Sequence, residues 1–360
     1  MDTIYIIAFL MVISISFILT PIVAKITKQL NIVSAPPSAG SRHIHKRATP
    51  RMGGLAIYSA FFIGCAFFVK GDQQIVALLL GGFVIAVSGM LDDLMEISAK
   101  QKIAFQIIAT LIVIFYGQIR ITSINIPGGF KLEFGVLSTL ITMLWIIGIT
   151  NAVNLIDGMD GLCAGVCSII LATIACLSYV QGRTDIVLLS VLLLGATLGF
   201  LFFNFYPASI FMGDCGSLFL GYMISTISLL GFKSSAFLTL GPAIFMLAIP
   251  IIDTFLSIIR RKVKGVSIST PDKEHLHHTL MYKMNLTHMK TVLTIYAITF
   301  YFSQIAYIYL INKRIALIML IIAAFAVEIF VEKTSMISKK YRPILWLVDL
   351  VKTVFGKEPK

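Results

Sequence analysis

Charged residues are scarce in this chain of 360 residues. Only 13% of the residues are Asp, Glu, Lys or Arg, whereas 58% are hydrophobic. This composition leaves too little polar surface for a soluble globular domain. Apolar runs of about 17–25 residues are long enough to cross a bilayer as helices. We therefore predict an all-α integral membrane protein.

Eleven apolar runs follow one another along the chain and leave little sequence for a separate soluble domain. Their ranges are roughly 3–24, 52–69, 74–91, 103–119, 136–150, 163–181, 186–203, 216–232, 236–259, 291–311 and 315–331. We predict about eleven transmembrane helices, with a catalytic membrane domain over 1–332 and a basic cytoplasmic tail over 333–360. The segment 122–134, which contains Pro-Gly-Gly, is expected to form a short hairpin between two of the crossings.

The first run lacks the basic residues that open a signal peptide, and Lys25 and Lys28 follow it. These lysines favour an amino terminus outside and a carboxyl terminus in the cytoplasm. With eleven crossings, the inside loops then hold 22 of the 29 basic residues, as this orientation requires. The net charge of +12 suits contact with the lipid bilayer and with anionic substrates, and it does not imply a nucleic acid.

Several familiar motifs are absent. The chain has no Walker A sequence, dinucleotide fingerprint or serine-hydrolase elbow. Its five cysteines lie mostly in or beside apolar runs, and the pair Cys163 and Cys167 has no second pair to complete a zinc site. Packing is therefore the favoured role of the cysteines.

Polar residues gather in five short clusters, and the predicted topology places all five on the inside. The clusters are 42–54, Asp92 with Asp93, 151–162, 204–214 and 275–278. The outside loops hold nothing comparable. This one-sided distribution predicts an active site that faces the cytoplasm.

The cluster at 151–162 has four amide or acid side chains at a spacing of three, without a lysine or arginine between them. These residues are Asn151, Asn154, Asp157 and Asp160. Uncompensated carboxylates at a membrane border are costly, so a metal ion, a polar substrate or both are expected here. Gly158 and Gly161 favour an irregular backbone, which membrane proteins tolerate where it lines a polar cavity. A polar connecting loop is the alternative.

Asp92 and Asp93 end the third run, where the negative end of a helix dipole makes adjacent carboxylates unfavourable without a cation. Lys102 is near in sequence, but we expect a divalent metal or a general-base role; a solvated helix end is the alternative. Oxygen ligands favour Mg²⁺, or Mn²⁺, over zinc. Asp214 precedes the eighth run and suits either a helix cap or a combined phosphate and metal site.

The histidines His275, His277 and His278 match no common zinc spacing. They suit binding of a polyanion or proton transfer in phosphoryl chemistry, and a plain interfacial loop is the alternative. Asp253 lies inside the ninth run, where it is either functional or paired with Arg260. Together the clusters suggest metal-dependent phosphoryl transfer to an acceptor that lies in the bilayer.

Five segments resemble the polyprenyl-phosphate N-acetylhexosamine-1-phosphate transferase family, in the same order along the chain. They are His45-Lys-Arg-Ala-Thr-Pro-Arg-Met-Gly-Gly54, Asp92-Asp93, Asn151 to Leu162, Phe211-Met-Gly-Asp214 and His275-Leu-His-His278. The resemblance covers nearly the whole chain. It implies transfer of a sugar 1-phosphate from a UDP-N-acetylhexosamine to undecaprenyl phosphate, with release of UMP.

The resemblance also implies roles for individual residues. Asp214 and Asn154 resemble Mg²⁺ ligands, and Asp92 and Asp93 resemble the carboxylates that deprotonate or position the lipid phosphate. His275 is expected to join Asp92, Asp93 and Asp214 as a catalytic residue. The residues expected to contact the substrate are Asp157, Asp160, Phe211, which would stack on uracil, Asn204, Lys46, His277 and His278.

The form His-Leu-His-His resembles the bacterial N-acetylglucosamine-1-phosphate branch, which begins synthesis of teichoic acid, O-antigen or a similar cell-surface polymer. The branch that uses UDP-N-acetylmuramoyl-pentapeptide has three consecutive histidines, which are absent here. Thr279 stands where an arginine is frequent, and Ser34 where an aspartate is common. Another UDP-N-acetylhexosamine or the pentapeptide substrate stays open, as does a homodimer. The expected location is the bacterial cytoplasmic membrane.

Two other classes of membrane protein fit the sequence less well. An intramembrane prenyltransferase would need two separated Asn-Asp-x-x-Asp motifs, and the chain has neither. A secondary transporter would explain Asp253 and a broken helix at Asn151, but it predicts charged groups near the bilayer midplane and internal symmetry. The polar clusters lie at one predicted face instead.

Overall fold

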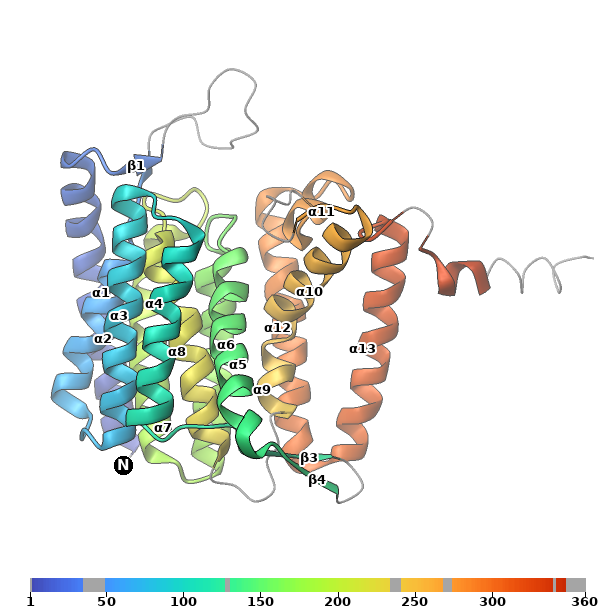
Figure 1. The fold of residues 1–360 in the computed structure, drawn as a ribbon. Coiled ribbons are helices and arrows are strands. Elements are labelled where there is room, and N and C mark those ends of the chain that lie inside the picture. Colours follow the sequence, from blue (N-terminus) through green and yellow to red (C-terminus); the bar gives the residue numbers. More distant parts are fainter. Residues whose placement is uncertain are drawn as a thin grey trace, which may run out of the picture.

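The structure, a computed structural model, describes residues 2–34, 49–126, 130–233, 241–267, 274–338 and 341–347. Helices dominate it and pack as a bundle (Figure 1). The helices are α1 (Asp2–Gln29), α2 (Gly54–Phe68), α3 (Gln73–Met95), α4 (Ala99–Leu111), α5 (Ser138–Leu155), α6 (Leu162–Val180), α7 (Thr184–Asn204), α8 (Gly213–Lys233), α9 (Gly241–Met246), α10 (Ala248–Val263), α11 (Leu276–Tyr282), α12 (His288–Ile311) and α13 (Lys313–Thr334). A π-helical turn, Ile112–Tyr116, extends α4, and a 3₁₀ turn, Gly135–Leu137, precedes α5.

The prediction of an all-α membrane protein is confirmed. Within the described ranges, nine helical segments are long and apolar enough to cross a membrane. The apolar helix α2 is shorter, with 15 residues. The described part of the predicted run 236–259 forms two helices, α9 and α10, which are separated at Leu247. The number of eleven crossings and the orientation of the termini stay predictions.

Two short antiparallel strand pairs accompany the helices. The pair β3 (Ser123–Ile126) and β4 (Phe130–Glu133) forms the hairpin predicted over 122–134. The pair β1 (Val33–Ser34) and β2 (Thr49–Pro50) was not predicted, because two residues are too few to give a periodic pattern.

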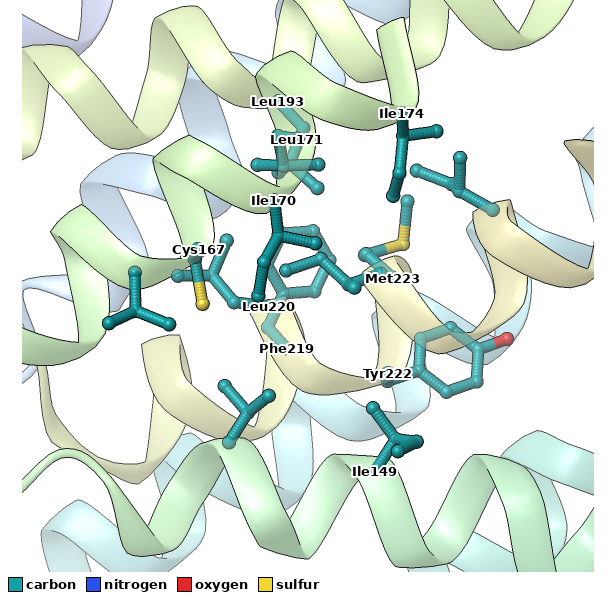
Figure 2. Close-up of a cluster of buried hydrophobic side chains, with 14 of the residues drawn as sticks. Ile149, Cys167, Ile170, Leu171, Ile174, Leu193, Phe219, Leu220, Tyr222 and Met223 are labelled. Atoms are coloured by element: carbon teal, nitrogen blue, oxygen red, sulfur yellow. The ribbon is translucent and has the colours of Figure 1, made fainter. Parts of the chain in front are cut away.

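The core surrounds α8, which packs against α2, α3, α5, α6 and α7. Figure 2 shows Phe219, Leu220 and Met223 of α8 interleaved with Ile149 of α5 and Cys167 of α6. Cys167 is a free, buried thiol, as are Cys65, Cys163 and Cys215. Four of the five cysteines therefore pack as predicted.

Glycines let two helices approach the beginning of α8 closely. A Cβ atom on Gly54 of α2 would clash with the backbone of Gly216, and one on Gly89 of α3 would clash with the backbone of Cys215. Small residues commonly allow such contacts between membrane helices. Because Gly89 lies one turn before Asp92 and Asp93, the contact places these two carboxylates beside the amino-terminal end of α8.

Candidate active site

Asp93, near the end of α3, binds the amino-terminal end of the neighbouring helix α8. Its Oδ1 accepts a hydrogen bond from the backbone N–H of Asp214, and its Oδ2 accepts one from that of Cys215, both at 3.1 Å. Gly213 has a φ of +73°, and a Cβ atom there would lie 2.5 Å from Asp93 Oδ2. The first N–H groups of a helix and its dipole favour a negative charge, so α8 partly compensates Asp93.

Lys102 of α4 lies between two carboxylates. Its Nζ is 2.7 Å from Oδ2 of Asp92 and 2.6 Å from Oδ2 of Asp214. The chain turns at Glu96, which ends α3 in the left-handed conformation, and Ser98 caps α4 so that α4 folds back along α3. The sequence predicted that a metal ion would compensate these carboxylates. Lys102, to which sequence reasoning gave no role, supplies part of that positive charge.

Asn154, at the end of α5, completes this acidic cluster, which we define as Asp92, Asp93, Lys102, Asn154 and Asp214. The Nδ2 of Asn154 donates to Oδ1 of Asp214 at 3.1 Å and to Oγ of Ser217 at 2.8 Å. Both oxygens of Asp214 thus contact residues from other helices. The alternative in which Asp214 serves only as a helix cap is wrong.

The acidic cluster has donors that fit Mg²⁺. Among the residues that the structure describes, no group of three His, Cys, Asp or Glu side chains could hold a metal ion by itself. Mg²⁺ rarely needs such a group of three side chains, because it is usually bound by one or two carboxylates, several waters and substrate phosphates. The ammonium group of Lys102 between Asp92 and Asp214 shows that two carboxylates converge on a cation. Asp214 would hold the metal, and so would Asn154 if its amide group turned so that Oδ1 replaced Nδ2 beside Asp214.

Asn151 belongs to a contact between helices. Its Nδ2 donates to Oε1 of the buried Gln106 in α4 at 2.7 Å, and Gln106 Nε2 donates in return to Asn151 Oδ1 at 3.4 Å. The residue that sequence reasoning left without a role thus fixes α5 against α4. Asn151 and Asn154 are both within α5, so the predicted irregular backbone is confined to 156–161.

Asp160 and Asn204 tie the irregular loop 156–161 to the loop 205–212. Asp160 Oδ2 accepts a hydrogen bond from the N–H of Ala208 at 2.9 Å, and both Asp160 and Asn204 are buried. Asn204 Oδ1 accepts from the N–H of Gly161, and its Nδ2 donates to the carbonyl of Ile210. These bonds give both residues a positioning role that the sequence did not predict.

Phe211 is held at the other end of the loop 205–212. Its N–H donates to the carbonyl of Pro50, and its carbonyl accepts from the N–H of Gly53. This pairing joins the described end of the predicted cluster 42–54 to the loop 205–212, next to the acidic cluster. Lys46 lies outside the described residues.

Asp157 lies within the field of the acidic cluster. It retains some exposed surface. Desolvation by the surrounding protein raises the pKa of Asp157 well above its usual range, and the carboxylates of Asp214, Asp93 and Asp160 raise it further. A cationic group or metal nearby would favour the ionised form of this side chain.

The histidine motif is fixed by Asp253 of α10. The Oδ2 of Asp253 lies 2.9 Å from Nδ1 of His275, and its Oδ1 accepts from the N–H of Leu276 at 2.8 Å. Asp253 is only 2% exposed. Sequence reasoning offered Arg260 as a partner for Asp253; the structure pairs Asp253 with His275 and brings Arg260 to Glu274 and to the carbonyl of Met336.

His277 connects the histidine motif with the loop 156–161. A Cβ atom on Gly158 would lie 2.6 Å from Nε2 of His277, so the two segments are in contact. The His277 ring is parallel to that of His275 and lies 4.2 Å, centroid to centroid, from that of His278. Burial, together with the charge of His278, lowers the pKa of His277 to about 3. His277 is therefore neutral near pH 7.

An open cavity of about 620 Å³ borders Asp93. Asp93, Glu96 and Arg51 supply charge to its wall, and Leu30, Leu94 and Met95 supply apolar surface. All five predicted clusters thus meet at one end of the bundle, in their described parts.

Comparison with known proteins shows which proteins this chain resembles. The family model described as glycosyl transferase family 4 matches residues 75–232, which include the acidic cluster, Asp157, Asp160, Asn204 and Phe211. A probable undecaprenyl-phosphate N-acetylglucosaminyl 1-phosphate transferase of Bacillus subtilis is 40% identical over 343 residues, which cover 94% of each chain.

Two further relatives have different named substrates. A decaprenyl-phosphate N-acetylglucosaminephosphotransferase of Mycobacterium leprae is 33% identical over 318 residues, or 78% of each chain. A phospho-N-acetylmuramoyl-pentapeptide-transferase of Anoxybacillus flavithermus is 32% identical over 305 residues, which cover 80% of this chain and 92% of that protein.

Proposed function

Because the chain belongs to the polyprenyl-phosphate N-acetylhexosamine-1-phosphate transferase family, in its bacterial N-acetylglucosamine branch, we propose that it uses UDP-N-acetylglucosamine and undecaprenyl phosphate. It transfers N-acetylglucosamine 1-phosphate to the lipid phosphate and releases UMP. This reaction is the first membrane step of a cell-surface glycopolymer pathway. The observation that carries the proposal is the acidic cluster, in which three helix ends bring two carboxylates to one cation.

In the proposed reaction, a lipid phosphate oxygen forms a bond to the β-phosphorus of the UDP-sugar, and the bond from that phosphorus to UMP breaks. Asp92 and Asp93 position the lipid phosphate and accept its proton. Lys102 places a positive charge between Asp92 and Asp214, next to the phosphates. Asp214 and Asn154 would hold Mg²⁺ or Mn²⁺, which would supply positive charge to offset the charge on the departing UMP.

The nucleotide-sugar lies, in this proposal, against the loops 156–161 and 205–212. Asp157 and Phe211 contact it directly, whereas Asp160 and Asn204 hold the two loops together. His275, His277 and His278, of which His277 contacts the loop 156–161 at Gly158, bind the sugar and diphosphate. The site faces the cytoplasm of a bacterial cytoplasmic membrane, because the predicted inside loops carry most of the basic residues.

A second candidate substrate is UDP-N-acetylmuramoyl-pentapeptide. The similarity to the Anoxybacillus transferase, over 80% of this chain, is the observation that favours it. The His-Leu-His-His sequence favours UDP-N-acetylglucosamine instead.

The test is UMP release by purified protein supplied with undecaprenyl phosphate and one nucleotide-sugar at a time. We expect release with UDP-N-acetylglucosamine and Mg²⁺, and none after chelation of the metal. Release with the pentapeptide substrate alone would establish the second candidate. Folded protein that releases no UMP with UDP-N-acetylglucosamine, UDP-N-acetylgalactosamine or the pentapeptide substrate would contradict the proposal.

A further inference from the structure

The helix α13 presents an apolar face that nothing in the described protein covers. Large exposed side chains follow this face along the first half of the helix, namely Leu317, Ile318, Ile321, Ile322 and Phe325. In Figure 1, α13 lies at one side of the bundle, next to α12. A helix of this length and composition is suited to contact with lipid acyl chains.

The chain turns sharply at the end of α13 and is fixed there. Ser335 adopts the left-handed conformation, and Met336, which is fully buried, donates its N–H to the carbonyl of Val331. The carbonyl of Met336 accepts from Nη1 of the buried Arg260 at 3.0 Å. Lys283 Nζ donates to the carbonyl of Thr334 at 2.7 Å. The turn is therefore anchored to α10 and to the end of α11.

A buried carboxylate then fixes the direction of the next segment. Glu332 is 1% exposed, and its two oxygens accept hydrogen bonds from the N–H groups of Ile344 and Leu345, both at 2.7 Å. These N–H groups belong to a helical turn that begins at Pro343. In Figure 1 this turn extends sideways from the end of α13, away from the bundle.

The segment 341–347, which we call the C-terminal arm, exposes large side chains in this position. Trp346 is 61% exposed and Leu347 is 55% exposed, although Ile344 and Leu345 are partly covered. Tryptophan is enriched where a membrane meets water, because its ring suits the headgroup region. The sequence from Lys333 to Arg342 contains four basic residues and no acidic one, which favours anionic lipid headgroups.

We propose that the C-terminal arm lies in the headgroup region of the bilayer and binds anionic phospholipids. The apolar face of α13 then contacts the acyl chains, the exposed Trp346 and Leu347 contact the headgroup region, and Glu332 sets the angle between these two surfaces. This inference is independent of the reaction proposed above, since none of these residues is placed in the active site.

The two tryptophans of the chain, Trp145 and Trp346, make the test direct. A Trp145→Phe variant leaves Trp346 as the only tryptophan and removes one hydrogen bond, to the carbonyl of Ser225. The full chain is reconstituted in nanodiscs that contain phosphatidylglycerol and phosphatidylcholine. The acyl chains are brominated either near the headgroup or near the methyl end.

We expect the emission of Trp346 to be blue-shifted from that of tryptophan in water and quenched more strongly by bromine near the headgroup. Adding Glu332→Ala should reduce the quenching, because the arm loses its fixed angle, whereas the control Glu133→Gln on the hairpin should not. Replacing phosphatidylglycerol with phosphatidylcholine should also reduce it. Emission typical of water without quenching would overturn the proposal, and so would blue-shifted emission that neither lipid quenches, which indicates contact with another copy of the chain.

Discussion

The acidic cluster and the histidine motif compensate charge in different ways. In the acidic cluster, carboxylates from α3 and α8 are bound by Lys102 and by the N–H groups of α8, and they remain partly accessible. In the histidine motif, Asp253 is buried against His275, and His277 is neutral. The first region is suited to phosphates and a metal ion, and the second to holding a substrate in place.

The largest expected effect comes from removing a carboxylate of the acidic cluster. Asp214→Asn removes the charge that would hold the metal and that pairs with Lys102. We expect UMP release to fall by roughly 10²–10³-fold, the scale reported for loss of one group that stabilises a transition state. The matched control is Glu133→Gln on the hairpin, which should retain normal activity. Normal turnover of Asp214→Asn would show that Asp214 does not hold a metal ion needed for the reaction.

Lys102→Met separates two roles of the cation. Without Lys102 the cluster is more negative, so half-saturation should need less Mg²⁺, whereas turnover should fall about tenfold or more as a phosphate contact is lost. A Mg²⁺ titration of UMP release measures both quantities. Lys100→Met, an exposed neighbour in α4, is the control. A rise in the Mg²⁺ requirement would show that Lys102 does not compete with the metal.

In the histidine motif, Asp253→Asn should act through His275. The variant keeps the shape of the side chain but weakens the bond that orients the imidazole. We expect the catalytic efficiency to fall by roughly 10–100-fold, as for other residues that orient a ligand through a hydrogen bond. The KM for UDP-N-acetylglucosamine should account for most of the change. An unchanged KM with a reduced kcat would instead make His275 part of the chemical step.

The smallest effect concerns pH. The pKa of His277 is lowered from 6.5 to about 3, so the folded protein favours the neutral ring. This contribution to stability is fully present above about pH 6.5 and is lost as the pH falls toward 3. His277→Gln should therefore flatten the decline of the melting temperature below pH 6.5. An identical decline in wild type and variant would contradict the burial of a neutral His277.

The sequence was sufficient to predict the long apolar helices and the positions of the polar clusters along the chain, because hydrophobic runs and their flanking charges are local properties. It did not predict α11 or the break at Leu247 between α9 and α10. It could not predict which side chains bind one another. The contact of Lys102 with Asp214 depends on the turn at Glu96 and on the close approach of α3 to α8 at Gly89.

The partners of two other residues depend equally on the fold. Asn151 has the same spacing as its neighbours but points to Gln106, and Asp253 reaches a histidine that is 22 positions further along the chain. Neither pairing leaves a periodic signal in the sequence. The contact between Gly158 and His277, which joins the two regions, has no local signal either.

The proposed reaction moves a phosphosugar to a lipid phosphate. The most direct measurement follows UDP-N-acetylglucosamine labelled at its β-phosphorus in the presence of undecaprenyl phosphate, Mg²⁺ and the purified protein. We expect the label to enter the lipid product and the released UMP to be unlabelled. Label that stays in water as UDP, while the sugar alone enters the lipid, would contradict the proposed reaction.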